Sequence, residues 1–420
     1  MKLTDINNRK INRNGFTIVE LLVVIVVIGI LAAITIVSYT GISQKAIAVS
    51  LQSDLNNAAT KIKLFKATND IFPGSITDCP SPAPTNLCIA SSSSNSFTYT
   101  ANNESFSLYD TNNTTNYRIT ESEKIRQTSI VCPIGFIVVP GSPTYSKTSD
   151  FCVMKYEAKA DDNGDGVGDT NHDTGFNGWS VYDYPISATR KITSSAAGYP
   201  ITGSTQIVAI SASSTANFVY GCPSGCHLIS EAEWMTLAQN LLSVPSNWSG
   251  GAVGSGSVYI GHTDLDPVLL LAASPNDDAG YYGTNNTSGP QRRTLTLTNG
   301  EVIWDLSGNV HEWTSGQTTG GEPGVTGSGA ATREFTAITN LGTLPINPLP
   351  SGTGIAGAGT WNATNGIGRI TSNADESVLR GFLRSNDFSD GVNSGILSIT
   401  MSLAPSYGWN DIVTGYRVAK

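Results

Sequence analysis

An apolar run near the start of the chain constrains this protein more than any other feature. The run extends from Phe16 to Ile36, and Glu20 is its single ionisable residue. A helix of roughly 20 residues crosses the hydrocarbon core of a bilayer. Residues 1–15 carry four basic side chains against one acidic side chain, so this flank should stay in the cytoplasm. The sequence therefore predicts a single-pass membrane helix.

Glu20 needs a partner, because a lone carboxylate inside a membrane helix costs several kcal/mol. Cleavage of the chain after Gly15 would give Phe16 a free amine, and the amine of a neighbouring subunit would then neutralise Glu20. A secretory signal has a shorter apolar core and a small-residue cleavage site after it, whereas Gly15 precedes the run. Cleavage ahead of the helix is therefore favoured over a plain single-pass anchor.

Residues 15–24 read GFTIVELLVV and resemble the type IV prepilin signal. The resemblance implies cleavage after Gly15 by a prepilin peptidase, N-methylation of Phe16, and assembly with other pilin subunits through the helix and Glu20. It also implies residence in the inner (cytoplasmic) membrane before assembly, and then at the cell surface or in an extracellular pilus filament. The proline that kinks many pilin helices is absent, with Val37 near its place. Pseudopilins of secretion systems share the signal, so both assemblies stay open.

The helix should continue past the membrane and pack against a small sheet. Three short segments rich in Tyr, Phe and Thr, separated by Asn-rich turns, predict strands at Ser96–Thr100, Ser105–Asp110 and Asn116–Thr120. We expect residues 16–126 to form one long helix and a small antiparallel sheet, as in a minimal pilin. The helix face that the sheet would cover carries apolar residues at three- and four-residue spacing, namely Ile47, Leu51, Leu55, Ala58, Ile62 and Phe65.

Six cysteines in an exported chain favour disulfides. Six cysteines allow 15 pairings, and sequence alone does not select one of them. Zinc is the rival interpretation for the pair in Cys222-Pro-Ser-Gly-Cys226, which His227 follows directly. Proximity along the chain favours the pairs Cys79–Cys88, Cys132–Cys152 and Cys222–Cys226.

A second unit is expected because 420 residues exceed one typical domain. The composition changes near residue 130, and we divide the chain into a leader at 1–15, a pilin-like part at 16–126 and a large part at 130–420. Residues 314–368 are rich in Gly, Thr and Pro, which predicts an extended surface loop. The net charge of -9 leaves no basic face for phosphates, so nucleic acid is excluded as a partner.

Four segments of the large part stand out, namely Phe151–Glu157, His227–Trp234, Val302–Trp313, and Leu379–Gly381 with Gly415–Val418. Together they resemble the sulfatase-modifying-factor (formylglycine-generating enzyme) type of C-type-lectin-like fold. In the second of them, Ser230 and Glu233 predict a capping box, and the helix should then bury Trp234, Leu237 and Leu241. The implied fold class is α+β, with a loop-rich lectin-like domain after the pilin helix and sheet. In the third segment, Trp304 and Trp313 should lie in the core.

The residues that the enzymes of this family use are missing. Their redox-active cysteine pair follows the Arg-Gly motif, but Cys226 is the last cysteine of this chain. His311-Glu312 begins like a zinc-protease motif, yet Ser315 stands where the second histidine is needed. We therefore expect a binding protein and not an enzyme, with a formylglycine-generating oxidase as the disfavoured alternative.

The tail Leu379–Lys420 resembles the variable region of diversity-generating-retroelement proteins, which display hypervariable ligand contacts on this fold. The resemblance implies a ligand-binding face for an extracellular protein or glycan, and the alternative is that the apolar members pack the closing strands. The predicted ligand contacts are Phe382, Leu383, Ser385, Asn386, Asp387, Phe388, Trp409 and Asn410.

A calcium loop is expected at residues 161–169. Oxygen side chains at Asp161, Asn163, Asp165 and Asp169, with Gly166 for the turn, suit a flexible calcium site. His172 stands where an EF-hand carries its twelfth-position Glu, so this is not a standard EF-hand, and a solvated acidic turn is the alternative. The family resemblance implies a second calcium near Asn309 and Glu312, unless Glu312 pairs inside the core.

These features lead to one preferred function and one close alternative. The preferred function is a pilin-anchored cell-surface binding protein, an adhesin or receptor that displays a lectin-like domain. The alternative is a pseudopilin tip component of a type II-like secretion system.

Overall fold

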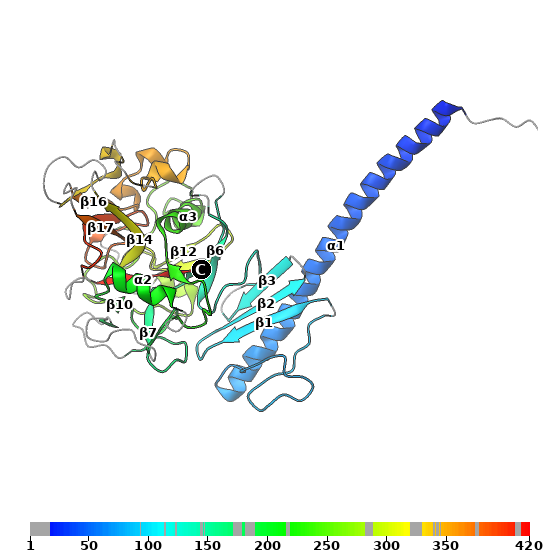
Figure 1. The fold of residues 1–420 in the computed structure, drawn as a ribbon, viewed down its shortest axis with the longest axis horizontal. Helices are drawn as coiled ribbons and strands as arrows, with labels where there is room; N and C mark the ends of the chain where they lie inside the picture. Colours follow the sequence, from blue (N-terminus) through cyan, green and yellow to red (C-terminus); the bar gives the residue numbers. More distant parts are fainter. Residues whose placement is uncertain are drawn as a thin grey trace, which may run out of the picture.

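The computed structural model describes most residues of the chain. They are residues 17–420 except 93, 113–114, 122–123, 143–145, 147, 171–178, 181–189, 216–218, 282–288, 320–329, 339–340, 342–343, 345, 374–377 and 408–412. Figure 1 shows a long helix that extends from a small sheet, with a larger unit beside that sheet. We call residues 17–128 the N-terminal unit and residues 130–420 the C-terminal unit.

Helix α1 (Ile18–Asn69) dominates the N-terminal unit. Thr17 caps its first turn, and Asp70 ends it in the left-handed conformation at φ 60°. The segment Ile18–Ile36 is long and apolar enough to cross a membrane, and none of it is buried. The segment therefore extends away from the folded units, as Figure 1 shows.

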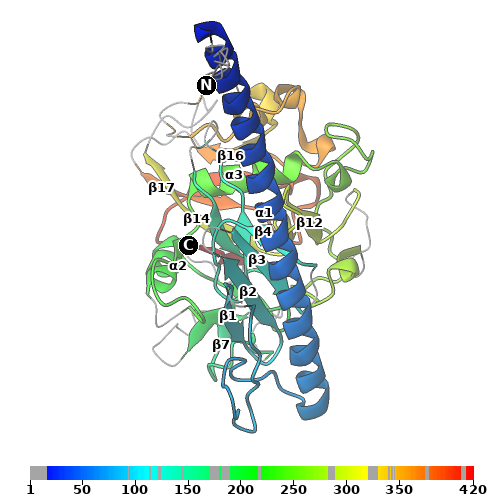
Figure 2. The same cartoon turned by 90° about the vertical axis from the view of Figure 1, so that its right-hand side faces the viewer.

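The second half of α1 packs on β2 and β3, an arrangement that Figure 2 shows from the side. Leu51, Leu55 and Ile62 of the predicted stripe are fully buried, because Phe106 and Leu108 of the sheet cover them. The three predicted strands are confirmed to within two residues, and β4 adds a fourth that the sequence did not indicate. The antiparallel order is β1 (Ser96–Ala101), β2 (Phe106–Asn112), β3 (Thr115–Thr120) and β4 (Arg126–Thr128).

One sheet of the C-terminal unit joins the start and the end of that unit. Val153 of β6 pairs with Ala419 of β20, so the closing residues of the chain are held inside the unit. The strand order is β11 (His227–Leu228), β20 (Val418–Ala419), β6 (Phe151–Met154) and β5 (Phe136–Val139).

A larger mixed sheet carries most of the C-terminal tail. Strand β17 lies antiparallel between β14 and β18, whereas β19 runs parallel to β14 and β16 runs parallel to β18. Both backbone edges of β17 are therefore paired with neighbouring strands. The strand order is β15 (Ala330–Arg333), β16 (Ile370–Asn373), β18 (Ile399–Leu403), β17 (Leu379–Arg384), β14 (His311–Thr319) and β19 (Thr414–Tyr416).

Two helices and several short elements complete the C-terminal unit. Helices α2 (Gln206–Ser214) and α3 (Glu231–Leu242) both begin with a side-chain cap, and α3 has the predicted capping box from Ser230 and Glu233. The paired short strands are β7 (Lys159–Asp161) with β9 (Lys191–Thr193), β8 (Trp179–Ser180) with β10 (Ile201–Thr202), and β12 (Thr294–Thr296) with β13 (Val302–Trp304). The 3-10 turns are Pro245–Asn247, Asp277–Tyr281, Phe335–Ala337, Pro350–Thr353, Ala358–Thr360, Ala363–Asn365 and Gly391–Asn393.

The predicted α+β class is confirmed by this combination of helices and largely antiparallel sheets. Trp234, Trp304 and Trp313 are all buried, as expected from their motifs. The prediction of a surface loop over 314–368 is wrong for much of that segment. Strand β14 continues to Thr319, and Phe335 and Trp361 pack into the main core because their apolar side chains find partners there.

All three proximity-based disulfides are present. The pairs Cys79–Cys88, Cys132–Cys152 and Cys222–Cys226 account for every cysteine. The zinc alternative for Cys222 and Cys226 is therefore wrong, because both thiols are consumed in a disulfide bond.

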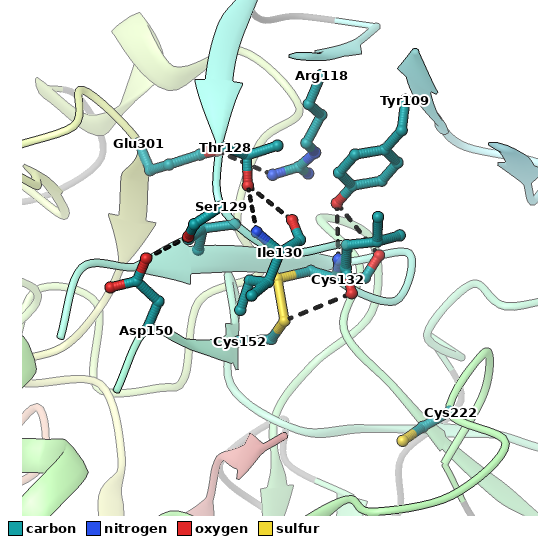
Figure 3. The surroundings of a disulfide bond; sticks show 12 residues. Tyr109, Arg118, Thr128, Ser129, Ile130, Cys132, Asp150, Cys152, Cys222 and Glu301 are labelled. Carbon is teal, nitrogen blue, oxygen red and sulfur yellow. Dashed lines mark hydrogen bonds and ion pairs between the residues drawn. A yellow bond between two sulfur atoms is a disulfide. The ribbon is translucent and has the colours of Figure 1, made fainter. Parts of the chain in front are cut away.

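Polar contacts join the two units, and Figure 3 shows those near the Cys132–Cys152 disulfide. The hydroxyl of Tyr109 on β2 accepts from the backbone N–H of Cys132 at 2.9 Å and donates to its carbonyl at 3.2 Å. The carboxylate of Glu104 accepts from the N–H groups of Ala196 and Ala197 at 2.9 and 2.8 Å. These contacts hold the small sheet against the C-terminal unit.

Candidate ligand-binding site

The N-terminal processing site lies partly outside the described residues. Gly15 and Phe16 belong to that part of the chain, so the structure carries no information on the cleavage point. The carboxylate of Glu20 accepts from the N–H and the hydroxyl of Thr17, both at 2.8 Å. Glu20 therefore completes a capping box at the start of α1 in this chain, and its carboxylate is directed toward the helix N-terminus.

An open pocket lies on the large sheet, where residues of β14–β18 and the loop after β17 meet. Its volume is about 290 Å³, close to the lower end of small-molecule sites at roughly 300–1,000 Å³. Its lining is mostly hydroxyl, amide and charged groups, with two leucines. The lining residues are His311, Thr332, Thr371, Leu383, Asn386, Asp390, Asn393, Thr400, Ser402 and Leu403.

Asn386 is the most unusual residue of this lining. It is 8% exposed, and its side chain has no hydrogen-bond partner among the described residues. Ser385 and Asn386 both have positive φ, at 76° and 70°, a region that non-glycine residues rarely adopt. Such strain persists only where the surroundings hold it, and it is frequent at binding sites. The fold therefore holds in the wall of the pocket an amide that has no partner among the described residues.

A cluster of one histidine and two aspartates borders the same pocket. Nε2 of His311 lies 3.2 Å from Oδ2 of Asp390 and 3.8 Å from Oδ2 of Asp387. Burial lowers the pKa of His311, but the hydrogen bond to Asp390 and the two negative charges outweigh burial and raise that pKa. Burial acts to raise the pKa of Asp390, but the hydrogen bond and charge of His311 hold it below its usual value.

The predicted ligand contacts of the tail separate into two groups. Phe382, Leu383 and Phe388 are at most 3% exposed, and Phe388 stacks on His262, so these side chains pack the closing strands. Interpreting Phe382 and Phe388 as exposed anchors is therefore wrong, because neighbouring strands and loops enclose both rings. Leu383 and Asn386 nevertheless line the pocket.

The remaining predicted contacts have other positions. Ser385 is buried, and its hydroxyl donates to the carbonyl of Gly308 at 3.2 Å. Asp387 joins the cluster with His311 described above. Trp409 and Asn410 lie outside the described residues. Of the predicted contacts that the structure describes, Leu383 and Asn386 line the pocket and Asp387 stands beside it.

The expected calcium loop is held together by its own backbone. Oδ1 of Asp161 accepts from the N–H groups of Gly164 and Asp165, and Oδ2 accepts from Gly166, at 2.8, 3.2 and 3.0 Å. Oδ1 of Asp165 accepts from Val167, and Oδ2 of Asp169 accepts from Asp162. Asn163 accepts from the N–H of Asp165 at 2.9 Å. Several oxygens that would bind calcium are therefore engaged within the loop.

Asn309 and Glu312 also have protein partners. Both oxygens of Glu312 accept from Nε of Arg417 at 2.9 Å, and both side chains are fully buried. Asn309 donates to Glu157 at 2.7 Å and accepts from the N–H of Leu271 at 2.9 Å. Glu312 therefore forms an ion pair inside the core, which is the alternative to the second calcium site.

The sequence did not identify His311 as a site residue. His311 entered the predictions only as the start of an incomplete protease motif, and Asp390 was not among the predicted ligand-binding or metal-binding residues. The two aspartates stand three positions apart in one loop, which is a weak signal because acidic turns are common. The histidine comes from a distant strand, so only the pairing of β14 with β17 brings the three side chains together.

The comparisons with known proteins concern the N-terminal end. A family model described as the prokaryotic N-terminal methylation motif matches residues 10–36. No curated protein sequence matches the chain. The matched segment overlaps the apolar part of α1, Ile18–Ile36. This motif supports a type IV pilin-like or pseudopilin-like surface component, which is membrane-anchored first and then processed by a prepilin peptidase and assembled with other pilin subunits.

Proposed function

We propose that this chain is a pilin-anchored cell-surface binding protein, an adhesin or receptor. In this proposal the N-terminal helix places the protein in a filament, and the C-terminal unit presents the pocket to an extracellular ligand. The observation that carries the proposal is Asn386, which is 8% exposed, lines an open pocket and has no side-chain partner among the described residues. An amide that lines an open pocket and has no protein partner there can both donate to and accept from a bound ligand.

The lining favours a hydroxyl-rich ligand such as a glycan. Thr371, Thr400 and Ser402 contribute hydroxyl groups, and Asn386 and Asn393 contribute amides, whereas the apolar lining consists of Leu383 and Leu403. Hydroxyl and amide groups both donate and accept, which matches the mixed donors and acceptors of a sugar. Thr371 already bonds to Thr332 and Asn393 to Arg369, whereas an apolar peptide anchor would cover the amide of Asn386 without giving it a partner.

The C-terminal unit is proposed to be a lectin-like domain of the sulfatase-modifying-factor type, used for binding and not for catalysis. Support comes from its four sequence segments and from the lack of any cysteine after Cys226. In the same proposal, the tail is a hypervariable face, and residues 161–169 bind calcium after the loop has exchanged some backbone contacts for the ion.

Glycan-array binding by the full chain in detergent tests the main proposal. We expect binding to a restricted set of glycans, and we expect Asn386→Ala to weaken it at least about tenfold, which is the scale of one unpaired polar group. Asn57→Ala is the matched control, because Asn57 is exposed on α1. Equal binding by wild type and Asn386→Ala, or binding to no glycan at all, would contradict the proposal.

The second candidate, a pseudopilus tip component, rests on the same methylation motif. Localisation separates the two candidates. Immuno-electron microscopy should show the protein along or at the tip of extended surface filaments if it is an adhesin. Confinement to the cell envelope, with loss of secreted proteins on deletion of the gene, would favour the pseudopilus.

A further inference from the structure

The His311, Asp387 and Asp390 side chains have the spacing of a metal site. One ligand atom from each lies within 4.8 Å of the others, and no other such group of His, Cys, Asp and Glu occurs in the part of the chain that the structure describes. His311 begins β14, and the two aspartates come from the loop after β17. A rigid sheet therefore supplies one ligand, and a short loop supplies two.

The distances suit a small ion. Zinc bonds of about 2.1 Å in a tetrahedral arrangement place two ligand atoms about 3.4 Å apart. The two measured separations from Nε2 of His311 are 3.2 and 3.8 Å, one on each side of this value. Calcium and magnesium prefer sites made of oxygen alone, whereas one imidazole with two carboxylates suits zinc or another divalent transition metal.

The ligand atoms are oriented before any ion binds. Oδ1 of Asp387 accepts from the N–H and the hydroxyl of Ser389, both at 2.7 Å, which leaves Oδ2 directed to His311. The backbone N–H of His311 donates to the carbonyl of Val413 at 2.8 Å and fixes the backbone at the strand end, and Oδ2 of Asp390 accepts from the N–H of Asp387 at 3.1 Å. Nδ1 of the ring is buried without a partner among the described residues, so Nε2 is the nitrogen that faces the aspartates.

Asn386 gives a second, independent indication of a ligand at this position. It directly precedes Asp387, lines the same pocket, is 8% exposed, and has no side-chain partner among the described residues. Three protein ligands leave at least one coordination position of a zinc ion open. An amide beside that position would hold a water molecule or a ligand oxygen bound to the ion.

We propose that His311, Asp387 and Asp390 bind one divalent transition-metal ion, zinc being the best match, whose open coordination position faces the pocket beside Asn386. This inference deepens the proposed binding function, and the ion would give the pocket a Lewis-acidic contact for a ligand hydroxyl or carboxylate. Metal binding itself rests on the geometry of the cluster and does not depend on the identity of the ligand.

The test is metal binding by the full chain in detergent, after EDTA treatment and dialysis. Calorimetry with zinc should give one site per chain, and cobalt should give the intense visible bands of a tetrahedral site with nitrogen and oxygen ligands. Loss of a partner outside the coordination sphere typically costs roughly 10- to 100-fold in metal affinity, so loss of a direct ligand should cost at least about 100-fold. We therefore expect His311→Gln and Asp387→Asn to bind zinc at least about 100-fold more weakly than wild type.

His227→Gln is the matched control, because His227 lies on β11 and bonds to Glu233 at 2.9 Å, outside the cluster. It should bind zinc like wild type. Unchanged affinity in both cluster variants would overturn the inference, as would wild-type protein that binds neither zinc nor cobalt. If a variant does not fold, zinc and cobalt binding by the wild-type protein still tests whether the chain binds a metal ion. If the protein binds the metal but no glycan, the proposed ligand class is wrong and the metal-site proposal is supported.

Discussion

Arg118 on β3 donates a 3.0 Å hydrogen bond to Oε1 of Glu301, and the pair joins the N-terminal unit to the C-terminal unit. Both side chains are almost completely buried, at 5% and 3% exposure. An ion pair in this position is screened little by water, so we expect it to help the Tyr109 and Glu104 contacts hold the small sheet against the larger unit.

Removal of one partner should destabilise the junction strongly. Arg118→Met removes the buried positive charge that lies 3.0 Å from the Glu301 carboxylate, and removal of one partner of a buried pair typically costs about 3–5 kcal/mol. Urea unfolding of the full chain measures this loss. The double variant Arg118→Met with Glu301→Leu should recover much of it, because neither charge is then buried alone. If the loss of stability in the double variant equals the sum of the losses in the two single variants, the two side chains do not act as a pair.

The Arg369–Glu334 pair provides the surface control. Its side chains are 35% and 30% exposed, and such pairs contribute about 0–1 kcal/mol. Arg369→Met should therefore shift the unfolding midpoint much less than Arg118→Met does. A similar shift in both variants would mean that burial of the junction pair has no special effect.

Asp110 should make the stability of the N-terminal unit depend on pH. Burial and the negative charge of Asp54 raise the pKa of Asp110 to about 7. The folded state therefore holds a proton that the unfolded state releases, so this contribution to stability is complete below about pH 4 and is lost as pH rises through about 7. Asp110→Asn removes the titrating group, and its thermal midpoint should exceed that of wild type by more at pH 8 than at pH 5.

Asp278→Asn is the control for this pH effect, because Asp278 is exposed in a 3-10 turn. It should follow the wild-type pH profile throughout. If Asp110→Asn and wild type give parallel profiles between pH 4 and pH 8, then Asp110 does not titrate in this window in the folded chain.

Glu20 should be required for assembly and dispensable for insertion into the membrane. Glu20→Gln removes the charge that a neighbouring subunit's terminal amine would neutralise, while the apolar segment Ile18–Ile36 still spans the bilayer. We expect the variant in the membrane fraction and absent from sheared surface filaments on immunoblots. Thr35→Val is the control, because the hydroxyl of Thr35 bonds only to carbonyls of its own helix, among the described residues. Normal filament incorporation of Glu20→Gln would contradict the assembly role.

The same filaments test processing. Mass spectrometry of the mature subunit should find N-methylated Phe16 as the first residue, because the methylation motif covers residues 10–36. An unmodified N-terminus, or cleavage at any other position, would contradict the proposed maturation.

Calcium should raise the thermal midpoint of the C-terminal unit within the full chain, if residues 161–169 bind the ion. Asp165→Ala should abolish the increase, because it removes a carboxylate from the centre of the loop. His311→Gln should retain the increase, since its proposed ion is a transition metal at another place in the fold. No shift on adding a calcium chelator to wild-type protein would remove the calcium proposal.

Diversification of the tail can be measured directly in a growing population. Deep sequencing of the 3′ end of the gene should find substitutions confined to codons 381–411, at adenines of a nearby template copy, if a retroelement acts on it. The buried Phe382 and Phe388 should vary less than Asn386, because exchange of a core ring destabilises the fold. An invariant tail would indicate one fixed ligand or a structural tip.

The features that were predicted best from the sequence depend on residues that are close together along the chain. The spacing of Leu51, Leu55 and Ile62 depends only on the period of one helix, and the sheet covers that face as expected. The capping box of Ser230 and Glu233 and the three disulfides likewise involve residues that are close along the chain. Such features need no knowledge of how distant strands pair.

The wrong predictions concern residues whose burial depends on partners that are distant along the chain. Phe382 looks like an exposed anchor in a polar loop, but β14 and β18 flank its strand and its ring joins the main core. The Gly-rich segment 314–368 looks like a surface loop, but Phe335 and Trp361 fill space left by other elements. Composition indicates which local conformation a segment prefers, whereas the burial of its side chains depends on which other elements pack against it.

The sequence by itself determined the membrane helix, its methylation motif, the face of α1 that the sheet covers and the disulfide pairs, because each depends on order and spacing over short distances. Only the tertiary structure decided the junction of Arg118 with Glu301 and the meeting of His311 with Asp387 and Asp390. These contacts follow from strand order and register, which are cooperative properties of the whole sheet and leave no local pattern in the chain.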